Sequence, residues 1–246
     1  MTTQTDTATG GNSDYTHITV VLDRSGSMGS IAGDVIGGFN HFLSEQRQHA
    51  SGHASLSLVQ FDTGNPYEVI HDFRPMPMVP PLTSATYEPR GGTPLLDAVG
   101  QAINSLDRSL KGLRDTEQPG RVLFVIVTDG EENASHQFTH SELSEMIAAR
   151  TSRGWQFVYL SADLAAFADS DRIGIRESHK MAFDKTSRGT ADAFYSMSDK
   201  ILFARRSSSV DENTFFDEVD RSKQSLERRR RTSSTGRRDG GDNSTN

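Results

Sequence analysis

The stretch THITVVLDRSGSM (residues 16–28) joins an apolar, β-branched run to a polar segment rich in hydroxyl groups. A run of this composition is typical of a strand that is buried on both faces of a parallel sheet. The run ends at Asp23, and Ser25 and Ser27 follow at alternate positions. The end of this strand therefore gathers one carboxylate and two hydroxyl groups in a short segment.

Strand and helix patterns alternate from this stretch to residue 206. We expect strands over 16–23, 54–62, 66–73, 121–129, 155–161 and 180–184, and helices over 30–48, 93–110, 139–153 and 190–206. The run at 66–73 follows 54–62 closely enough to be its hairpin partner, which predicts one antiparallel edge. Thr139 and Glu142 have the spacing of a capping box at a helix start. The alternation predicts an α/β fold with a doubly wound, mostly parallel sheet and helices on both faces.

Three regions of the chain differ in composition. We expect a disordered N-terminal tail over 1–13, one folded domain over 14–205, and a polar, Arg-rich, largely disordered C-terminal tail over 206–246. Between residues 221 and 238 the chain carries eight basic residues and one acidic residue, although its formal net charge is −7. Basic tails attract polyanions without sequence preference, so binding of nucleic acid through this tail stays open.

Composition excludes several kinds of site. The chain has no cysteine, which removes disulfides, thiolate zinc sites and cysteine nucleophiles. No apolar run approaches the roughly 20 residues that span a bilayer, so we expect no membrane contact. The first residues lack the basic and apolar regions of a signal peptide. These features predict a cytoplasmic protein.

Oxygen-bearing side chains follow two of the predicted strands and begin one of the helices. In doubly wound sheets, ligands bind outside the carboxyl ends of the strands, near the point where the strand order reverses. Asp23 and Asp129 end two strands, and Thr93 follows two glycines at a helix start. With Ser25 and Ser27, these residues offer two carboxylates and three hydroxyl groups. Oxygen ligands of low total charge suit a hard cation, so the sequence predicts a site for Mg²⁺ or Mn²⁺.

The same five residues resemble the metal-ion-dependent adhesion site (MIDAS) of von Willebrand factor type A (vWA) domains. Asp23, Ser25 and Ser27 match its D-x-S-x-S motif, Thr93 lies in GGTP, and Asp129 opens DGEEN. The resemblance covers residues 14–205. It implies that Ser25, Ser27 and Thr93 hold the cation directly or nearly so. It implies that Asp23 and Asp129 hold the cation largely through waters.

The resemblance also carries an expectation about function. It implies a binding module without enzymatic turnover, in which a remaining coordination position of the cation accepts a carboxylate. The partner is then a protein that presents Asp or Glu. Intracellular members of the family in bacteria and phages often act beside ATPases, so an ATPase is one expected partner.

Other interpretations use parts of the same pattern. Asp23 and Ser25 alone also fit an Asx-turn with a helix cap, but that interpretation leaves Thr93 and Asp129 unexplained. A metal-dependent phosphohydrolase with an aspartate nucleophile usually needs a second carboxylate two positions on, where this chain has Ser25. An adaptor that holds nucleic acid through the basic tail is the other open alternative.

The remaining polar residues near these motifs have simpler interpretations. Asp62, Asp97 and Glu131 match no metal position, and we interpret them as caps or solvated charges. Two histidine pairs have a spacing seen in zinc sites, His49 with His53 and His136 with His140. Neither pair is expected to project from one helical face, so the sequence does not favour a zinc site.

Overall fold

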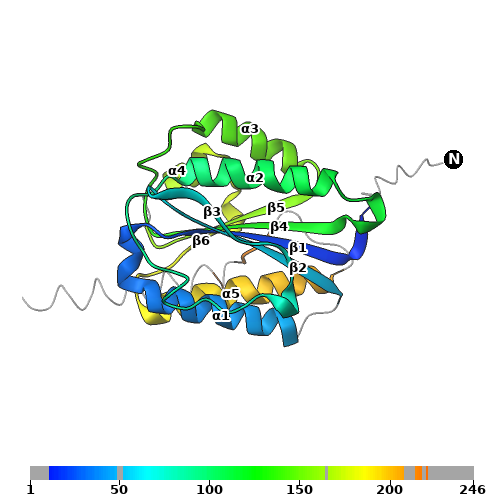
Figure 1. Ribbon diagram of the computed structural model, residues 1–246, viewed down its shortest axis with the longest axis horizontal. Helices are drawn as coiled ribbons and strands as arrows, with labels where there is room; N and C mark the ends of the chain where they lie inside the picture. The colour runs from blue at the N-terminus through cyan, green and yellow to red at the C-terminus, as the bar shows by residue number, and fades with distance from the viewer. Residues whose placement is uncertain (1–10, 49–51, 164–165, 208–213, 218–219, 221–246) are drawn as a thin grey trace, which may run out of the picture.

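The fold is a single sheet between two layers of helices, with α2, α3 and α4 on one face and α1 and α5 on the other (Figure 1). The computed structural model describes residues 11–48, 52–163, 166–207, 214–217 and 220. The strands are β1 (Asn12–Asp23), β2 (His53–Asp62), β3 (Asn65–Pro75), β4 (Pro119–Thr128), β5 (Trp155–Ser161) and β6 (Lys180–Ala182). The helices are α1 (Ala32–Gln48), α2 (Leu95–Lys111), α3 (His140–Thr151), α4 (Ala166–Arg172) and α5 (Ser187–Arg206).

The sheet has six strands in the order β3-β2-β1-β4-β5-β6. The edge strand β3 is antiparallel to β2, and the other neighbouring strands are parallel. The chain moves from β1 outward to β2 and β3, and then returns to β4 on the other side of β1. The strand order therefore reverses between β1 and β4, and the predicted α/β fold class is confirmed.

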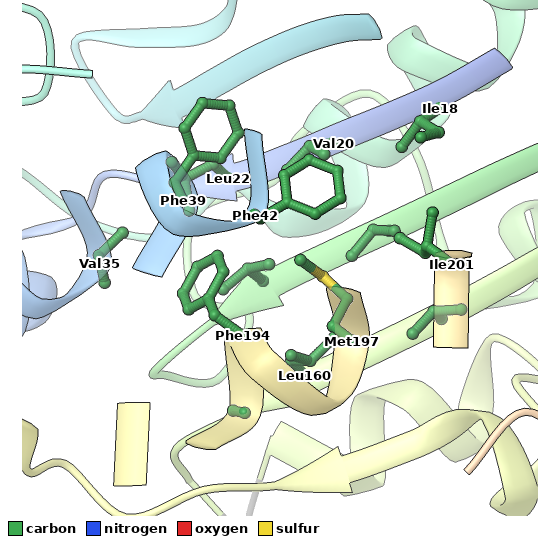
Figure 2. Packing of buried hydrophobic residues seen from close by; sticks show 14 of the residues in the cluster. Ile18, Val20, Leu22, Val35, Phe39, Phe42, Leu160, Phe194, Met197 and Ile201 are labelled. Atoms are coloured by element: carbon green, nitrogen blue, oxygen red, sulfur yellow. The ribbon is translucent and has the colours of Figure 1, made fainter. Parts of the chain in front are cut away.

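Strand β1 supplies side chains to apolar layers on both faces of the sheet. Ile18, Val20 and Leu22 are fully buried among residues of α1 and α5 (Figure 2). Val21 points to the opposite face and packs in the layer that includes α2 and α3. Because both faces are covered, the end of β1 is held on both sides.

Helices α1 and α5 pack closely against each other beneath the sheet. Figure 2 shows Phe39 and Phe42 of α1 beside Phe194 and Met197 of α5. Gly38 permits the close approach, because a Cβ atom there would lie 2.5 Å from the Phe194 ring. A larger residue at Gly38 would therefore force the two helices apart.

The structure corrects several sequence-based boundaries. The predicted helix over 30–48 divides into a 3₁₀ segment, Gly26–Ile31, and α1, while β1 begins four residues before the predicted strand. Helix α4 was not predicted, because its seven residues are too few to show an apolar period. Strand β2, expected to alternate, is buried at its last eight positions because helices cover both of its faces.

Part of the predicted C-terminal tail packs against the domain. Phe215 and Phe216 are buried in the layer formed by α1 and α5, and the Phe216 backbone N–H donates to the Ser178 carbonyl at 2.8 Å. Residues 1–10 and 221–246, which carry most of the two predicted tails and the Arg-rich segment, lie outside the described residues. Among the helices that are described, none has the length and apolar character needed to cross a membrane.

A buried histidine lies in β1, away from the end of the strand. The His17 side chain is fully buried, with Nδ1 at 2.8 Å from Ser55 Oγ and Nε2 at 3.1 Å from Thr19 Oγ1. Its ring stacks on Phe73 at 3.9 Å between centroids. Burial lowers the pKa of His17 to about 3, because a charged imidazole would lose its hydration there.

This low pKa predicts loss of stability in mild acid. The unfolded chain protonates His17 near its ordinary pKa of about 6.5, whereas the folded protein does not. The free energy of unfolding should therefore fall by about 2 kcal/mol from this group alone between pH 7 and pH 5. Urea unfolding of the wild type and of His17→Gln at both pH values measures the difference, since all other groups are shared. Equal pH dependence in the two proteins would contradict the prediction.

Candidate metal centre

The five predicted ligands lie at the carboxyl ends of β1 and β4, where the strand order reverses. Asp23 is the last residue of β1, and Asp129 follows the last residue of β4. Thr93 lies two residues before α2. Asp23 and Asp129 are fully buried, and Ser25 and Thr93 are 1% and 2% exposed. Ser27 is exposed, so the group of oxygen atoms opens to solvent on the side of Ser27.

Hydrogen bonds fix the Asp23 carboxylate. Its Oδ1 accepts from the Ser25 backbone N–H at 2.6 Å, and its Oδ2 accepts from Thr128 Oγ1 at 2.6 Å. The Tyr87 hydroxyl donates to the Asp23 main-chain oxygen at 2.7 Å. The Asx-turn that the motif alone suggested is therefore present, but the Ser25 side chain makes no capping hydrogen bond to the 3₁₀ segment that follows. The turn orients the loop and leaves the hydroxyl groups of the serines to face the other loops.

A short chain of polar contacts joins three of the predicted ligands. Ser25 Oγ lies 3.1 Å from Ser27 Oγ, and Ser27 Oγ donates to Asp129 Oδ1 at 2.5 Å. Thr93 completes the group, because a Cβ atom built on Gly130 would lie 3.6 Å from Ser27 Oγ and 3.8 Å from Thr93 Oγ1. The structure thus brings all five residues to one place from three separate loops.

The Thr93 loop is held by the loop that follows β4. The Thr93 backbone N–H donates to Asn133 Oδ1 at 2.9 Å, and the Asn133 backbone N–H donates to the Thr93 carbonyl at 3.2 Å. Asp97 is buried and accepts from the backbone N–H groups of residues 136 to 138, in the loop before α3, so its interpretation as a helix cap or a solvated charge is wrong. Glu131 is exposed, as expected for a solvated charge.

Comparison with known proteins finds solved structures with a similar fold. No family model matches the sequence, and no curated protein matches it. Among solved structures, the vWF domain of the type V pili tip protein Mfa5 from Porphyromonas gingivalis matches with a TM-score of 0.56 at 12% identity, over 79% of this chain and 97% of that chain. The von Willebrand factor type A protein from Catenulispora acidiphila matches with a TM-score of 0.51 at 13% identity, over 76% of this chain and 43% of that chain. The chain has a vWA-like fold.

Pilus proteins are also among the matches. The pilus adhesin SpaC from Lactobacillus rhamnosus GG has a TM-score of 0.56 at 13% identity, over 76% of this chain. The chain spans 30% of the length of SpaC, so the match concerns one part of that protein. At such identities the likeness shows the fold alone.

The electrostatics of this vWA-like domain favour a cation at the centre. Burial raises the pKa of Asp23 to about 6, although the hydrogen bonds from Thr128 and Ser25 oppose the rise. Asp129 Oδ2 is buried and accepts no hydrogen bond from the described residues. Because a buried carboxylate oxygen without hydrogen bonds is costly unless positive charge compensates it, this atom is a candidate contact for a cation. Two carboxylates and three hydroxyls are donors that Mg²⁺ and Mn²⁺ prefer, so the residues fit such an ion.

A lysine already lies beside this oxygen. Lys185 Nζ is 3.1 Å from Asp129 Oδ2, an ion-pair distance at which the angles do not meet those of a hydrogen bond. The Lys185 side chain is 38% exposed, whereas that of Asp129 is fully buried. Lys185 therefore supplies part of the positive charge that compensates the buried Asp129 carboxylate.

Histidine and acidic clusters do not offer a competing site in the described residues. The described part of the chain contains no group of three or more His, Cys, Asp or Glu side chains that could hold a metal ion. His140 Nε2 lies 2.9 Å from Asp169 Oδ1, so its ring pairs with a carboxylate. His49 lies outside the described residues. The candidate centre itself uses only two carboxylates, and the remaining donors are hydroxyl groups.

Three residues that contact the predicted ligands were not predicted from the sequence. Thr128 precedes Asp129 in the motif and orients Asp23, and its hydroxyl at the end of a buried strand was a usable signal. Tyr87 lies only six residues before Thr93 in the same loop, but its residue type gave no indication that it contacts Asp23. Lys185 gave no signal because it lies far from the motifs in the sequence.

The position of Lys185 leads to a testable prediction. Its positive charge repels a divalent cation bound beside Asp129, so Lys185→Met should raise the affinity for Mn²⁺ by about tenfold, or about 1.4 kcal/mol. Isothermal titration calorimetry measures the change. Lys200→Met is the matched control, because Lys200 contacts Asp217 and Asp220 at 2.8 Å and touches no predicted ligand. An unchanged affinity in Lys185→Met would show that the ammonium group does not compete with the ion.

Proposed function

We propose that this chain is a non-enzymatic protein-binding module whose candidate centre holds Mg²⁺ or Mn²⁺ and captures an Asp or Glu of a partner protein. The buried Asp129 carboxylate, whose Oδ2 accepts no hydrogen bond from the described part of the chain and lies 3.1 Å from Lys185 Nζ, carries the proposal together with the hydroxyl groups of two other loops. Ser25, Ser27 and Thr93 would hold the ion through their hydroxyl groups. Asp23 and Asp129 would compensate the charge of the ion and would contact it largely through bridging waters.

The balance of charges at the centre explains why a carboxylate would bind. Three of the five predicted ligands are neutral hydroxyl groups, so the ion would keep much of its positive charge. When it is bound at the centre, the ion would strongly attract the carboxylate of a partner protein. Ser27 is the exposed member of the group, so a partner side chain would reach the centre from that side.

The local chemistry favours binding over hydrolysis. A phosphohydrolase of the aspartate-nucleophile type uses a carboxylic acid two positions after the first aspartate. Here that position is Ser25, a neutral hydroxyl in contact with Ser27. An ATPase as partner and a cytoplasmic location remain predictions, as does nucleic-acid binding by the Arg-rich tail.

Selection of peptides from a random library tests the proposal. The immobilised full chain, loaded with Mg²⁺, should retain peptides that EDTA releases. Each retained peptide should contain an Asp or Glu whose replacement by Asn or Gln reduces binding at least about tenfold, because the charge-assisted bond is lost. Thr93→Ala should abolish retention, since it removes a hydroxyl ligand without removing core packing.

The matched control is Thr19→Ala. Thr19 is as buried as Thr93 but lies within β1, where its hydroxyl contacts His17. Thr19→Ala should retain the same peptides as the wild type. Retention that ignores EDTA, or that survives both loss of the acidic residue and Thr93→Ala, would show that the centre is not the binding surface.

A further inference from the structure

The turn between β2 and β3 lies against two of the loops that carry predicted ligands. Asp62, the last residue of β2, is fully buried. Its Oδ1 accepts from the backbone N–H groups of Gly64 at 2.6 Å and Asn65 at 3.1 Å, which fixes the turn. Its Oδ2 faces two arginine side chains from the ligand loops. This carboxylate thus links the turn to both loops.

The first arginine belongs to the Asp23–Ser27 loop. Arg24 is 5% exposed, and its guanidinium contacts Asp62 Oδ2 through Nε at 2.8 Å and Nη2 at 2.6 Å. The same guanidinium reaches Gln60 Oε1 at 3.2 Å and Glu68 Oε2 at 2.6 Å. Because Arg24 stands between two predicted ligands in the sequence, its position constrains both neighbours.

The second arginine belongs to the Thr93 loop. Arg90 Nε lies 3.2 Å from the same Asp62 oxygen. The backbones of the two loops also join, since Arg90 N–H donates to the Arg24 carbonyl at 2.8 Å and Gly26 N–H donates to the Gly91 carbonyl at 2.9 Å. The two ligand loops therefore contact each other and share one carboxylate.

A further contact from the turn closes the arrangement. Thr63 Oγ1 accepts from the Gly92 backbone N–H at 3.1 Å. Gly91 has φ of +66°, and a Cβ atom there would lie 2.3 Å from Thr63 Oγ1, so only glycine fits against the turn. This contact explains why the first residue of the GGTP segment is a glycine, since Gly91 packs directly against the β2–β3 turn.

We infer that Asp62 is a positioning residue for the metal centre. Through Arg24 and Arg90 it sets the distance between the hydroxyl groups of Ser25 and Ser27 on one loop and that of Thr93 on the other. Asp62 touches none of these three side chains and would not touch the ion. The inference rests on the proposed function, because the loops that Asp62 holds carry the predicted ligands.

A second buried carboxylate offers a matched control. Asp107, near the end of α2, contacts Arg150 Nε at 2.9 Å and Arg153 Nη2 at 2.6 Å. It has the same chemistry as Asp62, one carboxylate between two arginines. Thr93 precedes the start of α2, and Asp107 lies over three helical turns away, so loss of its charge should leave the ligand loops in place.

The test compares Mn²⁺ binding by Asp62→Asn and Asp107→Asn in the full chain. Titration calorimetry and the electron paramagnetic resonance signal of free Mn²⁺ both give the dissociation constant. Asp62→Asn should raise it at least about tenfold, whereas Asp107→Asn should change it less than about twofold. Circular dichroism confirms that both variants fold. Equal dissociation constants in the two variants would overturn the positioning role while leaving the proposed function in place.

A surface pair keeps the inference testable if Asp62→Asn does not fold. The side chains of Arg90 and Arg153 are 51% and 50% exposed, and each makes one ion pair with its carboxylate. Arg90→Ala should weaken Mn²⁺ binding about threefold, and Arg153→Ala should not. Equal binding by these two variants would overturn the inference. Absence of Mn²⁺ binding by the wild type would overturn the proposed function, and the inference with it.

Discussion

Two carboxylates buried at the ends of the central strands are the constraint on which the site depends. Asp23 is the last residue of β1, Asp129 follows the last residue of the neighbouring strand β4, and both are fully buried. Burying an ionised carboxylate costs several kcal/mol unless hydrogen bonds or an opposite charge compensate it. Thr128 and the Ser25 N–H supply hydrogen bonds to Asp23, whereas one oxygen of Asp129 keeps only Lys185 nearby. This unequal compensation of the two carboxylates supports the proposal that a cation binds beside Asp129.

The doubly wound sheet places these charges where a ligand can reach them. Apolar layers on both faces hold β1 from Ile18 to Leu22, and β1 and β4 end at the same edge of the sheet. The loops that leave this edge are then tied to each other, through Asn133 on one side and through Asp62 on the other. The sheet thus presents loops that hydrogen bonds and ion pairs hold in place, an arrangement that favours a preorganised site.

Most of the fold follows from the sequence, and so does the choice of the five residues that the structure brings together, because both depend on local patterns. The apolar runs predict the strands, and the helical periods predict α1, α2, α3 and α5. The D-x-S-x-S motif marks the edge of the sheet at which the parallel strands end. What local pattern cannot show is which distant charges meet. Asp62 was interpreted as a cap or a solvated charge, and it does fix its turn, but its burial against Arg24 depends on how β1 and β2 pair. Lys185 likewise reaches Asp129 only through the tertiary fold.

Anomalous diffraction from crystals soaked in Mn²⁺ tests whether the centre binds a divalent cation, because it locates the ion without reference to a partner. We expect one strong manganese peak among Ser25, Ser27 and Thr93, within about 2.0–2.6 Å of hydroxyl oxygens. We also expect Lys185 Nζ to move away from Asp129 when the ion is present. A structure with no peak there, or with manganese bound only elsewhere, would show that these residues do not form a metal centre.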